Sequence, residues 1–164
     1  MNSIDKVNKL SKSDFISIFG NVFEKTEWIA QKSYDLKPYK NFEELFSKMM
    51  EVFENIEKEK HLEILNAHPN LAVEKKLTRD SKKEQKNSSL NQCTEKEFIE
   101  FKKLNEEYKK KFGFPFIIAV KGKNKEEILN SFRQRITNNI NSEFEEAKKQ
   151  VKKIASFRLS EIIK

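Results

Sequence analysis

The stretch Asn66-Ala67-His68-Pro69-Asn70-Leu71-Ala72, followed by Ser81-Lys82-Lys83-Glu84-Gln85, stands out from a chain rich in Lys, Asn, Glu, Ile and Phe. His68 is one of only two histidines, and it precedes one of three prolines. Because proline disfavours the α conformation in the residue before it, we expect a helix arriving from Glu57 to end near Asn66. His68 would then lie at a rigid corner beside the negative end of the helix dipole, which favours a protonated ring. Such a ring is suited to acid or base catalysis, although a structural histidine would show the same pattern.

The composition around this stretch predicts an all-α protein. The chain has 164 residues, of which 37% are hydrophobic and 14 are Phe, enough to fill a core without disulfides or metal. Glycine and proline occur three times each, so residues that interrupt helices are scarce. We expect a single-domain multi-helix bundle over residues 1–164.

Start and stop signals mark several of the expected helices. Thr94 and Glu97 form a capping box, and Gly113 fits the C-terminal end of the helix that the box opens. Other residues suited to helix N-caps precede apolar residues at helical spacing, and these are Ser11 or Ser13, Asn41, Asn124 and Ser142.

One segment does not fit a helix. Residues 114–120 read Phe-Pro-Phe-Ile-Ile-Ala-Val, without a charge, and nothing else in the sequence suggests a strand that could pair with them. We expect extended backbone packed into the core, with amide and carbonyl groups that need partners.

Two further patterns each allow a structural and a functional interpretation. Ser81-x-x-Glu84 fits a capping box that opens a short helix. In the last expected helix, Arg158 is seven residues after Val151 and four before Ile162, so it lies on the apolar face. A buried guanidinium must find a carboxylate from the protein or from a ligand, unless the side chain extends to solvent near the helix end.

The charge pattern argues against nucleic acid as a partner. The formal net charge is +7, but only four of the 33 basic residues are Arg, and the lysines alternate with glutamates. Interspersed charge is typical of solvated helix faces. A basic helical nucleic-acid-binding module remains an alternative that predicts strongly salt-dependent binding.

The sequence also predicts no membrane partner and a cytoplasmic location. No apolar run approaches the length of a membrane span, and no secretory signal is visible. The final residues, Ile162-Ile163-Lys164, match no peroxisomal signal. The lone Cys93 cannot form an internal disulfide, which fits a reducing compartment.

Considered together, the motifs resemble the 2-oxo-4-hydroxy-4-carboxy-5-ureidoimidazoline (OHCU) decarboxylase family of urate degradation. The resemblance runs from about Phe15 to Ile163. The motifs that carry it are His68-Pro69-x-Leu71-Ala72, Ser81-x-x-Glu84-Gln85, Leu104-Asn105-x-x-Tyr108, the block from Phe112 to Ile118, and Arg158-Leu159. Two positions depart from the family pattern, Asn70 in place of an acidic residue and Val73 in place of a frequent glycine. These departures affect the expected hydrogen bonds and turn around the His-Pro corner.

The resemblance implies a cofactor-free and metal-free homodimer that decarboxylates OHCU, a small-molecule substrate, to (S)-allantoin. It implies that His68 and Glu84 are catalytic. The substrate-binding residues that it implies are Pro69, Ser81, Gln85, Arg158 and the main chain of Phe116, Ile117, Ile118 and Ala119. A catalytically silent dimeric scaffold of the same fold is a further alternative.

The chemistry of the substrate fits this set of residues. OHCU carries a hydroxyl and a carboxylate on one ring carbon next to a C=N bond, which can accept the electrons left by carbon dioxide, so no cofactor is needed. Arg158 suits the carboxylate, His68 the hydroxyl proton as general base, and Glu84 proton delivery or orientation. If Arg158 is incompletely paired before substrate binds, Arg158→Lys should change stability little. The other histidine, His61, is expected to be replaceable by Gln at little cost.

Overall fold

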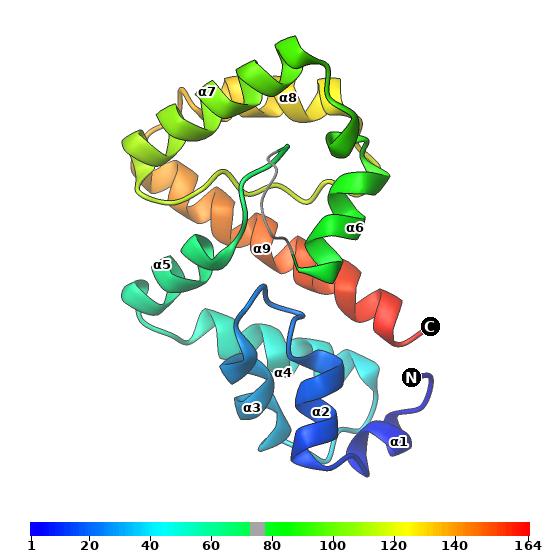
Figure 1. The fold of residues 1–164 in the computed structure, drawn as a ribbon. Helices are drawn as coiled ribbons and strands as arrows, with labels where there is room; N and C mark the ends of the chain where they lie inside the picture. The colour runs from blue at the N-terminus through cyan, green and yellow to red at the C-terminus, as the bar shows by residue number, and fades with distance from the viewer. Residues whose placement is uncertain (73–77) are drawn as a thin grey trace. The chain divides into compact units, whose positions relative to one another are not determined.

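The computed structural model describes residues 1–72 and 78–164, and within these ranges it contains helices and no strand (Figure 1). The predicted all-α class is therefore confirmed. Val73 lies outside the described residues. The α-helices, with a short 3₁₀ turn η1 (Leu90–Gln92), are α1 (Ile4–Asn8), α2 (Lys12–Phe19), α3 (Glu27–Tyr34), α4 (Phe42–Glu54), α5 (Lys58–Ala67), α6 (Arg79–Asn87), α7 (Glu95–Phe112), α8 (Lys125–Arg135) and α9 (Ile140–Ile162).

The helices belong to two compact units. The first comprises Met1–Ala67 and Lys152–Lys164, and the second comprises His68–Val151. Helices α1 to α5 and the C-terminal part of α9 lie in the first unit. Helices α6 to α8 and the N-terminal part of α9 lie in the second unit.

The first unit has an aromatic core between helices whose starts follow the predicted caps. The ring of Phe23 stacks on that of Phe53 at 5.2 Å between centroids. Ser11 accepts a hydrogen bond at the start of α2 and Asn41 does so at the start of α4, as their side chains predict. Helix α1 precedes this cap and was not expected from the sequence.

The second unit packs around Tyr108 of α7. Its ring contacts four phenylalanine rings, with centroid distances of 4.5 to 6.0 Å to Phe112, Phe114, Phe116 and Phe132. The capping box of Thr94 and Glu97 is present with both of its hydrogen bonds, and Gly113 ends α7 with φ of 82°. The predicted cap at Ser142 is wrong, because the side chain of Asn139 accepts the Ser142 N–H and α9 begins at Ile140.

The apolar segment of residues 114–120 is confirmed as non-helical and buried. Figure 1 shows it as a stretched coil that follows α7 and leads to α8. The residues of this segment other than Pro115 belong to the hydrophobic core. Its position in the second unit brings its backbone within reach of side chains from α8, α9 and the end of α6.

Candidate functional site

The His-Pro corner follows directly on the end of α5. That helix ends at Ala67, one residue beyond the predicted Asn66, because Pro69 disfavours α conformation at His68. His68 is buried, with 8% of its surface exposed. A histidine at a helix end with so little solvent access is held in a defined environment, as an acid or base requires.

Helix α6 buries a polar face. Its sequence, Arg-Asp-Ser-Lys-Lys-Glu-Gln-Lys-Asn, contains no apolar residue, yet Ser81 and Gln85 are buried and Glu84 beside them is half-buried. Buried polar side chains are costly unless they bind something. The buried face of α6 is therefore held by polar contacts, among them those of Gln85 with the loop after Pro69.

The predicted capping role of Ser81 and Glu84 is wrong. Thr78 is the N-cap of α6, and its hydroxyl accepts the Ser81 N–H at 3.2 Å. Both residues consequently lie inside the helix, and Ser81, Glu84 and Gln85 share one face through their spacing of three and four residues. Correcting the cap removes the simplest structural explanation for this pair.

Two amide side chains fix the loop that follows Pro69. Gln85 Oε1 accepts the Ala72 N–H at 3.1 Å, and Gln85 Nε2 donates to the Asn70 carbonyl at 3.2 Å. Asn105 Nδ2 of α7 donates to the Leu71 carbonyl at 3.0 Å. These contacts hold Ala72 at a φ of 55°, a left-handed conformation that is unfavourable for a residue with a Cβ. Gln85 thus supports the corner, and an amide side chain retains capacity for further hydrogen bonds.

Side chains from three elements hold the backbone of the apolar segment. Arg135 Nη1 donates to the Ile117 carbonyl at 2.6 Å, and Gln150 Oε1 accepts the Ala119 N–H at 2.9 Å. Ser88 Oγ donates to the Val120 carbonyl at 2.8 Å. The prediction that this backbone needs partners is confirmed at these three groups. Within residues 1–72 and 78–164, neither the N–H nor the carbonyl of Ile118 has a protein partner.

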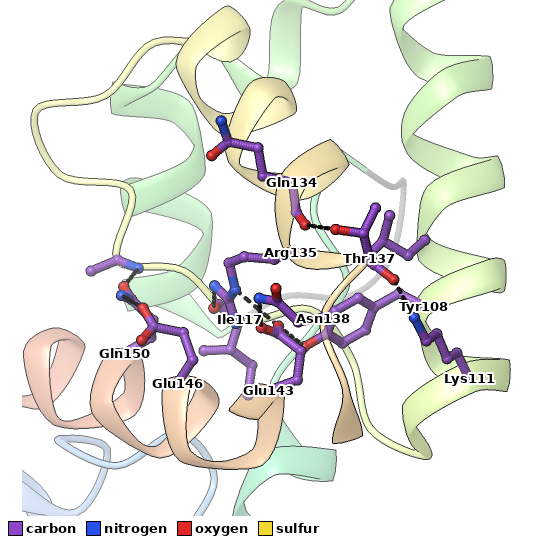
Figure 2. A network of polar contacts seen from close by, with 12 residues as sticks. Tyr108, Lys111, Ile117, Gln134, Arg135, Thr137, Asn138, Glu143, Glu146 and Gln150 are labelled. Atoms are coloured by element: carbon purple, nitrogen blue, oxygen red, sulfur yellow. Dashed lines mark hydrogen bonds and ion pairs between the residues drawn. The ribbon is translucent and has the colours of Figure 1, made fainter. Parts of the chain in front are cut away.

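Sequence reasoning missed the charged cluster around Arg135 (Figure 2). Arg135 Nε donates to Glu143 Oε1 at 2.9 Å, and the Tyr108 hydroxyl donates to the same oxygen at 2.5 Å. Asn138 Nδ2 donates to the other oxygen of Glu143 at 3.1 Å. Burial and the bond to Glu143 raise the pKa of Tyr108 well above its usual range. Helical spacing offered one signal, since Arg135 is three residues after the buried Phe132.

Arg158 meets a protein carboxylate in the first unit. Its Nη2 lies 3.2 Å from Glu24 Oε2, and its Nη1 donates to the Asn21 carbonyl at 2.8 Å. The two side chains are 5% and 0% exposed. The predicted burial of Arg158 is confirmed, and the alternative that it extends to solvent is wrong. A protein carboxylate thus already pairs with the guanidinium, so the condition under which Arg158→Lys was expected to change stability little is not met.

The structure groups most of the predicted site residues in one unit. His68, Pro69, Ser81, Glu84, Gln85 and residues 116–119 all belong to the second unit, whereas Arg158 belongs to the first. The described residues contain no group of three or more His, Cys, Asp or Glu placed to hold a metal ion. Among the helices of the described ranges, none combines the length and apolar character of a membrane span.

Comparison with known sequences identifies the family. The OHCU decarboxylase profile matches residues 8–160. The chain belongs to the OHCU decarboxylase family. A relative from this family in Haloferax volcanii, named 2-oxo-4-hydroxy-4-carboxy-5-ureidoimidazoline decarboxylase, is 33% identical over 97% of this chain and 95% of its own length.

Two further similarities extend this assignment. A uric acid degradation bifunctional protein of Bacillus sp. (strain TB-90) is 40% identical over all of this chain, which spans only 33% of that protein's length. The crystal structure of (S)-allantoin synthase matches with a TM-score of 0.81 and 25% identity, over 100% of this chain and 54% of that one. In both cases this chain matches only part of a longer chain.

Proposed function

We propose that this protein decarboxylates OHCU to (S)-allantoin in urate degradation. The observation that carries the proposal is the buried polar face of α6, whose Gln85 bonds the loop of the His68-Pro69 corner. These hydrogen bonds connect two of the family motifs, His68-Pro69-x-Leu71-Ala72 and Ser81-x-x-Glu84-Gln85. Residues 1–164 act as one OHCU decarboxylase-like domain in this proposal.

The proposed roles follow from the chemistry of each group. His68 removes the proton of the substrate hydroxyl, and Glu84, half-buried on α6, delivers or orients the proton that reaches the neighbouring ring carbon. Ser81 and Gln85 bind polar atoms of the substrate from the same helix face, and Pro69 shapes the wall beside His68. Delivery of the proton to one face gives one enantiomer of allantoin.

The backbone of the apolar segment is proposed to bind the ring and ureido groups of the substrate. Phe116, Ile117, Ile118 and Ala119 are buried, and within the described ranges Ile118 offers a donor and an acceptor with no protein partner. OHCU carries both N–H and C=O groups that can pair with such a backbone. Arg158 is proposed to bind the substrate carboxylate, since a guanidinium has five donors and can take part in more than one contact.

Further parts of the proposal concern assembly, cofactors and location. We propose a cytoplasmic homodimer that needs no metal or organic cofactor and has no nucleic-acid partner. Analytical ultracentrifugation tests the dimer, and cell fractionation tests the location. A basic nucleic-acid-binding module would instead show binding that weakens steeply as salt increases.

The decisive experiment is an assay with freshly generated OHCU, followed by circular dichroism. The protein should accelerate the appearance of a single allantoin enantiomer. If the spontaneous rate and a racemic product persist at high protein concentration, the decarboxylase proposal fails and the silent scaffold is favoured. A His68→Asn variant provides the matched control for contaminating activity.

A further inference from the structure

We propose that Arg135 and Gln150 are positioning residues for the decarboxylation, a role that rests on the proposed function. Neither residue is one of the proposed catalytic or substrate-binding groups. Each holds one main-chain group of the segment that is proposed to bind substrate, at Ile117 and at Ala119 respectively. Together they would fix the orientation of Ile118, the residue between these two anchors.

The alternation of an extended backbone explains why these anchors matter. In extended backbone, the N–H and C=O groups of residues i and i+2 point to one edge, and those of residue i+1 point to the other. Arg135 and Gln150 bond Ile117 and Ala119, two residues apart. The polar groups of Ile118 are therefore directed to the opposite edge, where no described residue bonds them. A ligand with an N–H and a C=O can pair with both.

Arg135 is itself held rigidly. Its Nε is paired with Glu143, and its guanidinium lies over the Phe116 ring at 4.4 Å from the centroid. Tyr108 and Asn138 in turn orient the Glu143 carboxylate (Figure 2). The planar guanidinium makes the ion pair and the Ile117 contact at once, which an ammonium group on a flexible stem does poorly. The cost of this buried charge suggests a purpose beyond stability, since buried ion pairs are weak stabilisers.

Gln150 is oriented by a neighbour on its own helix. Its Nε2 donates to Glu146 Oε1 at 2.9 Å, four residues earlier on α9, which leaves its Oε1 for the Ala119 N–H. Figure 2 shows this pair of contacts beside the Arg135 cluster. Gln150 is thus a second anchor that carries no charge, and it can be removed without leaving a buried ion unpaired.

The expected kinetic effect is on substrate affinity. Backbone groups that bind the ring edge contact substrate equally in the ground state and the transition state, so their misplacement raises KM and leaves kcat nearly unchanged. If Arg135 and Gln150 had a purely structural role, their substitution would lower the melting temperature. KM and kcat of the protein that remains folded would then be unchanged. The split between KM and kcat therefore separates positioning from simple stability.

The test uses the variants Arg135→Lys and Gln150→Met at temperatures well below their melting temperatures. Initial rates of OHCU decarboxylation give KM and kcat, and calorimetry gives the Kd for (S)-allantoin. We expect KM and the allantoin Kd to rise together, about tenfold for Arg135→Lys and about threefold to tenfold for Gln150→Met. Arg133→Lys is the matched control, because Arg133 lies on the same helix and pairs with Glu100, but at the surface. It should leave KM and Kd as in the wild type.

The possible results distinguish failure of the positioning role from failure of the proposed decarboxylase function. Unchanged KM and Kd in a folded Arg135→Lys or Gln150→Met protein would overturn the positioning role while the decarboxylase proposal stands. A loss confined to kcat would also overturn it. If Arg135→Lys does not fold, Gln150→Met alone decides. If the wild type neither accelerates the reaction nor binds allantoin, the proposed function fails and the positioning role fails with it.

Discussion

Nη2 of Arg158 lies 3.2 Å from Oε2 of Glu24, a residue 134 positions earlier in the chain, and both side chains are buried. This ion pair joins the C-terminal part of α9 to the loop after α2 within the first unit. Removal of one member would leave the other charge buried.

Arg158→Met should therefore lower the free energy of unfolding by about 3–5 kcal/mol, because Glu24 would remain as a buried carboxylate. Urea unfolding measures the loss. The double variant Glu24→Gln with Arg158→Met should recover part of it, since two neutral partners leave no stranded charge. Equal stability of Arg158→Met and the double variant would show that the Glu24 carboxylate left behind carries no cost, which would contradict this explanation.

Arg158→Lys tests the separate proposal that this residue binds the substrate carboxylate. Lysine keeps the positive charge but loses the planar, two-pronged contact, so activity should fall strongly in protein that remains folded. Initial rates at low temperature provide the measurement. Near-normal rates alongside a lowered melting temperature would remove Arg158 from the proposed site and leave only its structural role.

His68→Asn should remove most of the activity and leave the fold intact, with a loss of about 100- to 10,000-fold if the ring is the general base. His61 now serves as the comparison for stability. It is buried, its Nε2 lies 2.8 Å from the Phe53 carbonyl oxygen, and it packs edge-on against the Phe53 ring. These contacts favour a cost in stability for His61→Gln, in contrast to the tolerance expected from the sequence. His61→Gln should lower the melting temperature while folded protein keeps its rate. Similar losses of rate at both positions would contradict a special role for His68.

Thr78→Ala and Ser81→Ala should have opposite consequences. Thr78 caps α6, so Thr78→Ala should cost about 0.5–2 kcal/mol of stability with a smaller effect on rate. Ser81 lies inside the helix on its buried face and has no capping role, so Ser81→Ala should reduce kcat/KM more than stability. Thermal melts and initial rates on the two variants give the comparison. The reverse pattern would restore Ser81 to a structural role.

Tyr39 should make stability pH-dependent in alkaline solution. Burial, with the nearby Glu44 carboxylate, raises the pKa of Tyr39 to about 12, and its hydroxyl donates to the Ser33 carbonyl. A pKa that is higher in the folded state gives stability that is complete below about pH 10 and is lost as pH rises toward 12. The stability difference between wild type and Tyr39→Phe should narrow across this range in urea titrations. A constant difference would contradict the assignment.

Chelation should leave the activity unchanged, because the substrate supplies its own electron sink in the proposed reaction. The measurement compares initial rates before and after dialysis against a chelator, with metal analysis of the protein. Loss of activity that zinc restores would contradict the cofactor-free mechanism.

Local signals in the sequence correctly predicted several helix ends and buried faces. The box of Thr94 and Glu97, the glycine at position 113 and the cap at Asn41 each act within a few residues, so the sequence alone contains the interaction. The placement of Arg158 among apolar residues likewise follows from helical spacing. At α6 the local pattern indicated Ser81 as the cap, whereas Thr78, three residues earlier, caps the helix in the structure.

The family motifs predicted the residues of the candidate site, and the tertiary structure decided which groups contact one another. Four of the contacts join residues 13 to 134 positions apart, and no local rule relates such positions. These contacts are Arg158 with Glu24, Gln85 with Ala72, Arg135 with Ile117, and Gln150 with Ala119. The sequence also did not show that the main-chain groups of Ile118 differ from those of Ile117 and Ala119. Only the contacts of Arg135 with Ile117 and of Gln150 with Ala119 reveal this difference. Sequence by itself determined the helical class, several helix ends and buried faces, and the family, because these depend on short-range periodicity and motif order. Tertiary structure decided the pairing of buried charges and backbone groups, because each buried polar group must be satisfied by whatever the fold brings beside it.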